Sequence, residues 1–320
     1  MTTYPDMLMH LGGVPVQDMT QGNVWFVKPS SGSDGYRGKT PRYPVKTLTK
    51  AKALAIANQN DIIYMFAESD TAASTTDYQS TTLLWTKDAV HLKGVNAAPS
   101  LSQRSRIAIL STATAASVAP LMTVSANGCK FENIEIISAL GAAGAVGNLL
   151  VSGQHNHFVN CHIAGTGHAT QDVAGNYSLK VTGQENLFED CTIGLDTIAR
   201  GAGGQTYEMY MSGGATRNIF RNCRIITYAG ANTQTFLTVP TTGIDRWNLF
   251  ENCSFINMPT GISSGTTMTQ ALSITGGGSP DGCIILRNCS FTGATKVETS
   301  ASGKVQITPT ITALTINNNI

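Results

Sequence analysis

Charged and aromatic side chains are scarce in this sequence: 13% of its 320 residues are Asp, Glu, Lys or Arg, and 7% are aromatic. A typical soluble domain carries about 25% charged residues. The 21 basic and 20 acidic residues nearly cancel, and no run of Lys or Arg stands out. Because nucleic acids and anionic membrane surfaces are bound by clustered cations, we expect no nucleic-acid partner.

Long hydrophobic runs are also missing. A membrane-spanning helix needs about 18 or more apolar residues in a row, and no window approaches this length. The opening stretch, MTTYPDMLMHLGGVPV, has neither a basic start nor the apolar core of about 7–15 residues of a secretory signal. We therefore expect synthesis in a cytoplasm, no export by a classical signal and no membrane insertion.

Cysteines at metal-binding or disulfide spacing are absent as well. The seven Cys are an odd number, no C-x2-C pair occurs, and the closest two, Cys283 and Cys289, are six residues apart. Five Cys share one position of a repeat: Cys161, Cys191, Cys223, Cys253 and Cys289. Since free Cys packs as a small hydrophobe, we expect a row of core thiols in preference to a metal ladder.

The sequence does contain a repeated phrase: Phe or Leu, any residue, Asn or Asp, usually Cys, any residue, Ile or Phe. It begins at six positions, Phe131, Phe158, Phe188, Phe220, Phe250 and Leu286, which are 27 to 36 residues apart. Repeats of this length indicate a solenoid or a propeller. Each phrase follows a short alternating apolar segment such as Leu149/Val151 or Met209/Met211, and no repeat has room for a helix.

Three short strands per repeat predict an all-β fold, a right-handed parallel β-helix with three strands per rung; propeller blades need four antiparallel strands with hairpin turns. The Asn of the phrase tolerates left-handed backbone and suits the tight bend between two strands. We expect a ladder of bend residues, namely Asn133, Asn160, Asp190, Asn222, Asn252 and Asn288. The residue before each bend points outward, so Glu189, Arg221, Glu251 and Arg287 should alternate in sign along the stack.

The two ends of the chain depart from the repeat. The pattern of residues 45–57 predicts an amphipathic helix, with Leu48, Ala51 and Ala55 on its apolar face, that covers the first rung. We divide the chain into an attachment arm (1–22), a capping strand, helix and first rung (23–66), the β-helix (67–302), whose rungs before residue 125 look irregular, and a C-terminal cap (303–320). Five apolar residues of the arm are candidates for docking on a partner: Tyr4, Met7, Leu8, Leu11 and Val14.

The segment VWFVKPSSGSDGYRGKTPRYPVKTLTKAKALA, ending in NDIIYMFAES, resembles the leader of many right-handed parallel β-helix proteins of the pectate-lyase-like superfamily, which is common among bacteriophage structural proteins. With the repeats, the resemblance spans about residues 23 to 300. It implies a virion component, often a homotrimer. One fold hosts many activities, so the resemblance is far more specific for fold than for function.

No catalytic, metal or cofactor residues emerge from the sequence. The Asp-Asp, Asn-Thr-Asp and Gly-His-Gly signatures of polygalacturonase-like enzymes are absent, as are nucleotide-binding motifs. Four His residues crowd one rung, but no carboxylate has a predictable place beside them: His155, His157, His162 and His168. We expect a polar loop surface there, with metal binding as the less favoured alternative.

These observations favour a non-enzymatic bacteriophage virion protein, a capsid decoration, head fibre or turret protein, held to the capsid or another virion protein by its arm. The alternative is a tailspike-like protein that binds or degrades polysaccharide, for instance a glycan of the host surface. A third class, a cell-surface adhesin, is disfavoured because the sequence shows no signal peptide. The loops that leave each rung at one corner are the expected contact zone in any of these roles.

Overall fold

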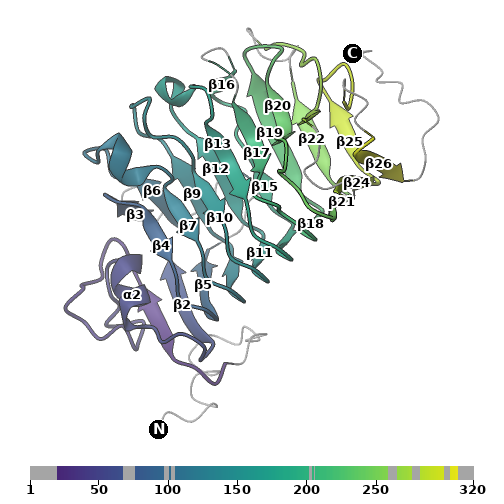
Figure 1. Cartoon of the computed structure of the whole chain (residues 1–320). Helices are drawn as coiled ribbons and strands as arrows, with labels where there is room; N and C mark the ends of the chain where they lie inside the picture. The colour runs from purple at the N-terminus through teal and green to yellow at the C-terminus, as the bar shows by residue number, and fades with distance from the viewer. Residues whose placement is uncertain are drawn as a thin grey trace.

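The computed structural model describes residues 20–67, 76–96, 101, 105–201, 204, 206–258, 265–275, 282–298 and 303–308. The five candidate docking residues of the arm, Tyr4, Met7, Leu8, Leu11 and Val14, lie outside these ranges. Figure 1 shows strands of successive rungs stacked side by side along the rod, with the α-helix α2 at the N-terminal end.

Three parallel sheets form the walls of the rod. Sheet A contains β1 Val24–Val27, β2 Asp61–Phe66, β5 Val90–Val95, β8 Lys130–Glu132, β11 His157–Val159, β14 Leu187–Glu189, β18 Ile219–Arg221, β21 Trp247–Glu251, β24 Cys283–Arg287 and β26 Val305–Thr308. Sheet B contains β3 Thr76–Gln79, β6 Arg106–Ile109, β9 Glu135–Ser138, β12 His162–Thr166, β15 Thr192–Ile193, β19 Arg224–Ala229, β22 Ser254–Asn257 and β25 Ser290–Thr292, with β16 Ala199–Arg200 paired to β19. Sheet C contains β4 Leu83–Trp85, β7 Met122–Val124, β10 Leu149–Val151, β13 Tyr177–Val181, β17 Tyr207–Met211, β20 Thr235–Val239 and β23 Leu272–Ile274.

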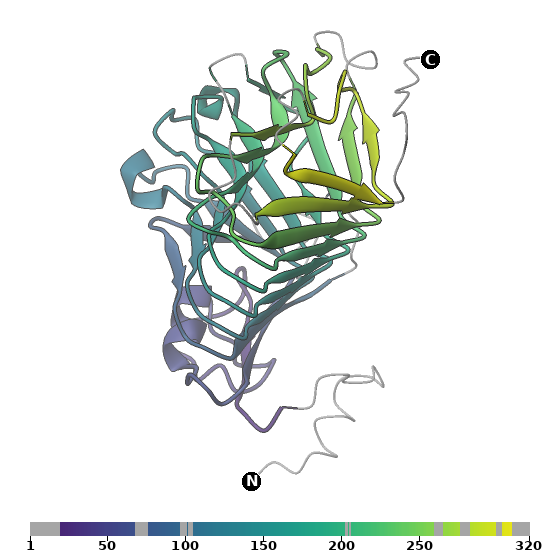
Figure 2. The same cartoon turned by 45° about the vertical axis from the view of Figure 1, so that its right-hand side comes forward.

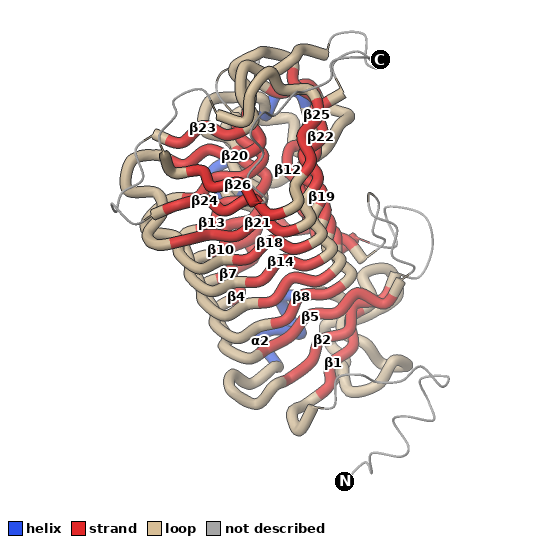
Figure 3. The backbone as a smooth tube through the Cα atoms, turned by 90° about the vertical axis from the view of Figure 1, so that its right-hand side faces the viewer, coloured by secondary structure: helices blue, strands red, loops and turns tan. Residues whose placement is uncertain are grey.

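A rung runs from sheet C through sheet A to sheet B, and a longer loop returns to sheet C of the next rung (Figure 3). This succession confirms the predicted three-stranded parallel β-helix. The apolar pieces between residues 82 and 125 form regular rungs, because β4, β5 and β6 pair in the same three sheets as their successors. The expectation of irregular early rungs was wrong. At the other end, β26 pairs with β24 and extends sheet A by one strand.

Inward side chains of equal position stack on one another from rung to rung. In sheet A the rings of five Phe lie 4.6–4.7 Å apart with interplanar angles of 5–10°, namely Phe131, Phe158, Phe188, Phe220 and Phe250. This distance reproduces the strand spacing of about 4.8 Å, so the hydrogen-bonded ladder sets the ring stacking. Four repeat cysteines are buried as free thiols, and Cys289 near the end of the stack is half-buried.

The bend between sheets A and B has left-handed backbone in every rung of the repeat. The six predicted bend residues have φ between 48° and 55°: Asn133, Asn160, Asp190, Asn222, Asn252 and Asn288. Side-chain amides connect neighbouring rungs in part of this ladder, as from Asn160 Nδ2 to Asn133 Oδ1 at 2.8 Å. The left-handed bend lets each rung turn in a minimum of residues.

A second, fully buried Asn ladder lies at the entry to sheet A. Asn218 Oδ1 accepts from the backbone N–H of Asn186 at 3.0 Å, and Asn218 Nδ2 donates to Gly183 O at 3.1 Å. The same pattern repeats along the row Asn156, Asn186, Asn218 and Asn248. These amides satisfy backbone groups that the turn from sheet C leaves unpaired, which buried polar groups require.

The N-terminal end is covered by α2, Leu48–Leu54, whose ribbon lies at this end of the rod (Figure 2). Leu48, Ala51 and Ala55 are buried, as predicted. The helix is shorter than the 45–57 pattern indicates. The backbone N–H of Val45 donates a hydrogen bond to the carbonyl oxygen of Phe26 in β1, so Val45 belongs to the sheet and not to the helix. The helix begins after Thr47, whose side chain accepts a hydrogen bond from Lys50 N. Two 3-10 turns, Ala115–Val118 and Ala169–Gln171, lie in loops. No helix within the described ranges is long and apolar enough to cross a membrane.

Candidate functional site

The outer face of sheet C carries a group of aromatic side chains, which we call the tyrosine platform: Tyr177, Tyr207 and Tyr210, with Lys180. Tyr207 and Tyr210 are stacked, with ring centroids 4.9 Å apart and an interplanar angle of 21°. Lys180 Nζ lies 5.3 Å from the Tyr210 ring centroid and 5.9 Å from that of Tyr177. All four residues are partly exposed. Three aromatic faces and one cation are thus presented together on β13 and β17.

The register of the strands produces this grouping. Tyr177 pairs with Tyr207, and Lys180 pairs with Tyr210, in adjacent parallel strands. Tyr210 points outward because its neighbours Met209 and Met211 both point into the core and are fully buried. Sequence reasoning used the two methionines to locate the strand and missed the outward residue between them. Tyr177 and Tyr207 each stand two residues before an inward residue of their strand, Leu179 and Met209. This shared position is the sequence signal that could have revealed the aromatic group.

Gly147 provides the space for the Tyr177 ring. Its φ is +88°, and a Cβ atom placed there would lie 2.5 Å from Cζ of Tyr177. Burial raises the pKa of the Tyr177 phenol to about 12, and also raises that of Tyr207, where Tyr210 contributes. Both phenols therefore remain protonated hydrogen-bond donors at neutral pH.

A buried ion pair ties the loops beside the platform to the rod. Arg200 Nη1 lies 3.3 Å from Glu208 Oε2, and the two side chains are 2% and 0% exposed. Glu208 also accepts from Ser178 Oγ and from Thr227 Oγ1, the latter at 2.8 Å. Burial raises the pKa of Glu208, although Arg200 opposes the shift. Arg200 further donates to Tyr207 O, so the ion pair holds a platform strand directly.

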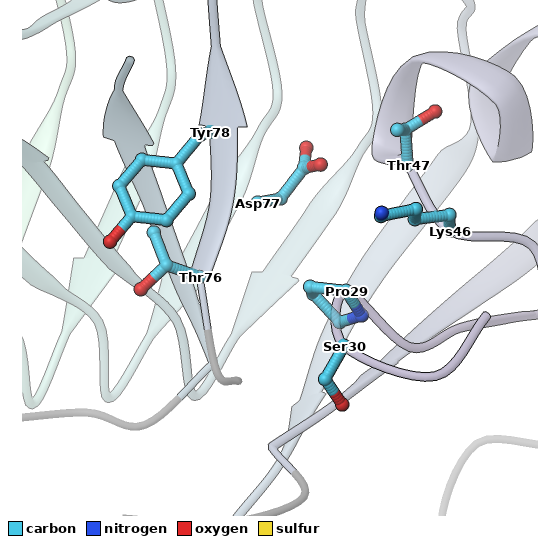
Figure 4. Close-up of a pocket in the computed structure, with 7 residues that line it drawn as sticks. All are labelled: Pro29, Ser30, Lys46, Thr47, Thr76, Asp77 and Tyr78. Carbon is cyan, nitrogen blue, oxygen red and sulfur yellow. The ribbon is translucent and has the colours of Figure 1, made fainter. Parts of the chain in front are cut away.

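A pocket of about 450 Å³ lies at the N-terminal end, between the capping segment and β3 (Figure 4). Its lining comprises Pro29, Ser30, Lys46, Thr47, Thr76, Asp77 and Tyr78. Asp77 occupies the inward row that Ile107 continues in β6, and it is only 3% exposed. Its Oδ2 accepts from Leu48 N at 3.3 Å, so the carboxylate connects sheet B to the start of α2.

Burial raises the pKa of Asp77 to about 7. Catalytic hydrolysis of sugars uses two carboxyl groups about 5–9.5 Å apart, and Asp77 is the one carboxyl among the lining residues. We therefore interpret this pocket as a gap where the N-terminal cap packs on the rod, and not as a hydrolytic site. The sequence offered no signal for it, because a carboxylate in a core row breaks the apolar pattern.

Carboxylates lie beside three of the four clustered histidines, at places that the sequence did not predict. His155 pairs with Glu185 at 2.7 Å and His157 with Glu189 at 3.4 Å. These partners come from the next rung, 30 or more residues away, which explains why local sequence does not show them. Buried His162 lies 3.7 Å from Glu135, and burial lowers its pKa to about 4.

Among the residues that the structure describes, no group of three or more His, Cys, Asp or Glu side chains is placed to hold a metal ion. The repeat cysteines line the core row instead, and burial raises the pKa of the Cys161 and Cys223 thiols well above its usual value.

The fold and its ladders define the class of protein: a right-handed parallel β-helix with a pectate-lyase-like fold. Solved structures with this fold include a rhamnogalacturonan lyase, at 14% identity and a TM-score of 0.54 over 84% of this chain and 68% of that one. A pectin methylesterase in complex with a hexasaccharide matches at 18% identity and a TM-score of 0.54, over 87% and 81% of the two chains. The pectin methylesterase from Aspergillus niger matches at 14% identity and a TM-score of 0.53, over 93% of each chain. These likenesses show the fold; no family model and no curated protein sequence matches the chain significantly.

Proposed function

We propose that the protein binds an acidic polysaccharide through the tyrosine platform and does not cleave it. The observation that carries this proposal is the stacked pair Tyr207 and Tyr210 with Lys180 beside it, on an outer face of the rod. Binding sites for small polar ligands combine aromatic surface with a few well-placed polar groups. The platform has both.

The chemistry of the platform suits a sugar polymer with carboxylate groups. The C–H face of a pyranose ring packs on an aromatic face, and the protonated phenols donate hydrogen bonds to ring or hydroxyl oxygens. Lys180 supplies a positive charge for a uronate or similar carboxylate. The platform spans the two adjacent rungs of β13 and β17, so neighbouring sugar units of one chain can contact both strands.

The outward row that contains the platform favours binding over cleavage. Its members along sheet C carry no carboxyl group: Leu84, Thr123, Leu150, Lys180, Tyr210, Thr238 and Ser273. Hydrolysis by retention or inversion needs two carboxyl groups across the sugar. The polysaccharide connection is also supported, at the level of fold, by neighbours named for acting on pectin or rhamnogalacturonan, one of them solved with a hexasaccharide.

Affinity electrophoresis in gels that contain polygalacturonate or neutral dextran tests the proposal. We expect polygalacturonate to retard the protein, and Tyr210→Ala to weaken binding about 2- to 13-fold, from the loss of about 0.5–1.5 kcal/mol of ring stacking. Gly147→Ala should weaken binding as well, because the new Cβ displaces the Tyr177 ring. Tyr78→Ala, at a 44% exposed tyrosine of sheet B, is the matched control and should bind normally.

No release of reducing ends or unsaturated products is expected from polygalacturonate. Release of such products would refute the non-catalytic part of the proposal. An unretarded wild-type protein, or a Tyr210→Ala variant that binds as tightly as wild type, would refute the site itself.

A second candidate function is attachment within a bacteriophage virion, which is supported by the sequence resemblance of the leader and repeats. In that role the rigid rod presents its loops and platform while residues 1–22 hold it to the capsid or to another virion protein. Deleting residues 1–22 should abolish incorporation into particles and leave the isolated rod folded. Undiminished incorporation of the truncated protein would eliminate the arm as the anchor.

A further inference from the structure

The outer face of sheet A over β14, β18, β21 and β24 carries three parallel rows of side chains, and Figure 3 shows these strands stacked along the rod. The central row is aliphatic, namely Leu187, Ile219, Leu249 and Ile285. On one side lies the charged row Glu189, Arg221, Glu251 and Arg287. On the other side lies the mixed row Glu185, Arg217, Trp247 and Cys283. We call the three rows together the sheet A face.

The charged row alternates strictly in sign and is held in place by ion pairs between rungs. Arg221 contacts Glu189 at 3.3 Å and Glu251 at 3.1 Å, and Arg287 contacts Glu251 at 3.1 Å. The side chains keep 19–52% of their surface exposed. The charges are therefore ordered and still accessible to a partner.

The aliphatic row beside it is partly exposed in all four strands. Four adjacent Leu and Ile side chains on the outside of a sheet, bordered by ordered charges, have the composition of a protein interface, with an apolar centre and a polar rim.

We propose that two copies of this chain pack face to face through the sheet A face with their rods antiparallel. A two-fold axis along the strands brings each row onto the same row of the second copy and reverses the order of the rungs. The charged row reads Glu, Arg, Glu, Arg, and its reverse reads Arg, Glu, Arg, Glu. Glu189 then faces Arg287 of the partner subunit, and Arg221 faces the partner's Glu251.

The other two rows are also compatible with this reversal. The aliphatic row meets itself, which removes Leu and Ile surface from water on both copies. In the mixed row, Arg217 faces the partner's Trp247, a cation–π pair, and Glu185 faces the partner's Cys283 without a charge conflict.

A parallel arrangement is disfavoured by the same rows. A two-fold axis along the rod places equal rungs at the same height and exchanges the charged row with the mixed row. Glu189 then faces the partner's Glu185, and Arg221 faces the partner's Arg217. Like charges face each other at both rungs, and such contacts oppose association.

The size of the contact predicts a reversible dimer. The four strands of the sheet A face, about 4.8 Å apart and about five residues wide at 3.3 Å each, give a footprint of roughly 300 Å² per copy. The total of about 600 Å² is smaller than that of standard specific interfaces, so the contact is a weak and transient one. Sheet C remains uncovered, so a dimer would present two tyrosine platforms; the dimer does not depend on the proposed polysaccharide binding.

A sign-swapped variant, E189R/R221E/E251R/R287E, tests the antiparallel register. It keeps the alternation along its own row and so keeps the ion pairs between rungs. We expect wild type and variant each to form dimers in sedimentation experiments, and native mass spectrometry of their mixture to show both homodimers and at least about 10-fold fewer heterodimers than random pairing. Abundant heterodimers would refute the antiparallel geometry, because in that register every charge of the wild-type row faces a like charge of the variant row.

The aliphatic row is tested separately by Ile219→Asp, which introduces a charge at the centre of the contact. The association constant should fall by about 10-fold or more, whereas Leu84→Asp, at a 49% exposed leucine of sheet C, should dimerise like wild type. Equal dimerisation of the two variants would exclude the sheet A face. A wild-type monomer at concentrations up to about 1 mM, or a wild-type trimer, would overturn the proposal as a whole.

Discussion

Asp77 makes stability depend on pH in an unusual direction. Its carboxyl occupies the first position of an otherwise apolar inward row and touches the start of α2 through Leu48 N. Burial raises its pKa from 3.8 to about 7. Since a shift of one unit corresponds to about 1.36 kcal/mol, ionising Asp77 in the folded protein costs on the order of 4 kcal/mol relative to the unfolded chain.

The sign follows from which state holds the proton more tightly. The folded state keeps Asp77 protonated up to about pH 7, whereas the unfolded chain releases the proton near pH 4. The stabilising contribution is therefore fully present below about pH 4 and is lost as pH rises through about 7. Asp77→Asn removes this titration and retains an oxygen that can accept from Leu48 N. We expect it to match wild type near pH 4 and to exceed it by up to about 4 kcal/mol at pH 8.

Urea unfolding measures this difference at several pH values, with tryptophan fluorescence as the probe, because Trp25 and Trp85 are both buried in the rungs next to the cap. Asp196→Asn makes the same charge change at an exposed loop position and serves as the control. A difference between Asp77→Asn and wild type that stays constant from pH 4 to pH 8 would refute the reasoning.

Two further predictions concern the ladders. Asn218→Ala should destabilise the protein by about 2–5 kcal/mol in urea unfolding, because it leaves the buried Asn186 N–H and Gly183 C=O unpaired, whereas Asn222→Ala at the exposed bend should cost only about 1–2 kcal/mol. An equal cost at both sites would contradict the assigned roles. A thiol reagent should modify the half-buried Cys283 and Cys289 in the native protein and reach the other five cysteines only after unfolding; rapid native labelling of all seven would show that the core row is not closed.

The rung pattern could be predicted in detail because it depends on local rules. The left-handed bend at Asn133 and its successors requires a residue type that tolerates positive φ. The inward Phe and Cys and the outward Glu and Arg follow from alternation along a strand. Even the ion pairs around Arg221 could be anticipated, because register repeats from rung to rung.

The tyrosine platform and the pocket beside Asp77 could not be predicted in the same way. Tyr207 and Tyr210 are adjacent only because β17 places both outward beside a loop that Arg200 and Glu208 hold in position. Asp77 opposes the apolar rule of its row and is tolerated because the helix supplies a backbone N–H. In both places a contact with a segment outside the strand decides the position of a side chain that the alternation along the strand does not predict.

The sequence by itself therefore determined the repeat, the three-sheet rod, the capping helix and the sign of each outward charge, since each depends on residues within one rung or in equivalent positions of the next. Only the tertiary structure decided which faces carry a usable surface, namely the tyrosine platform on sheet C and the aliphatic row on sheet A, and where the pocket beside Asp77 lies. The physical reason is that the burial of a side chain, and its contacts with segments far away in the sequence, depend on how rungs and loops pack in three dimensions. A pattern along the sequence does not contain that information.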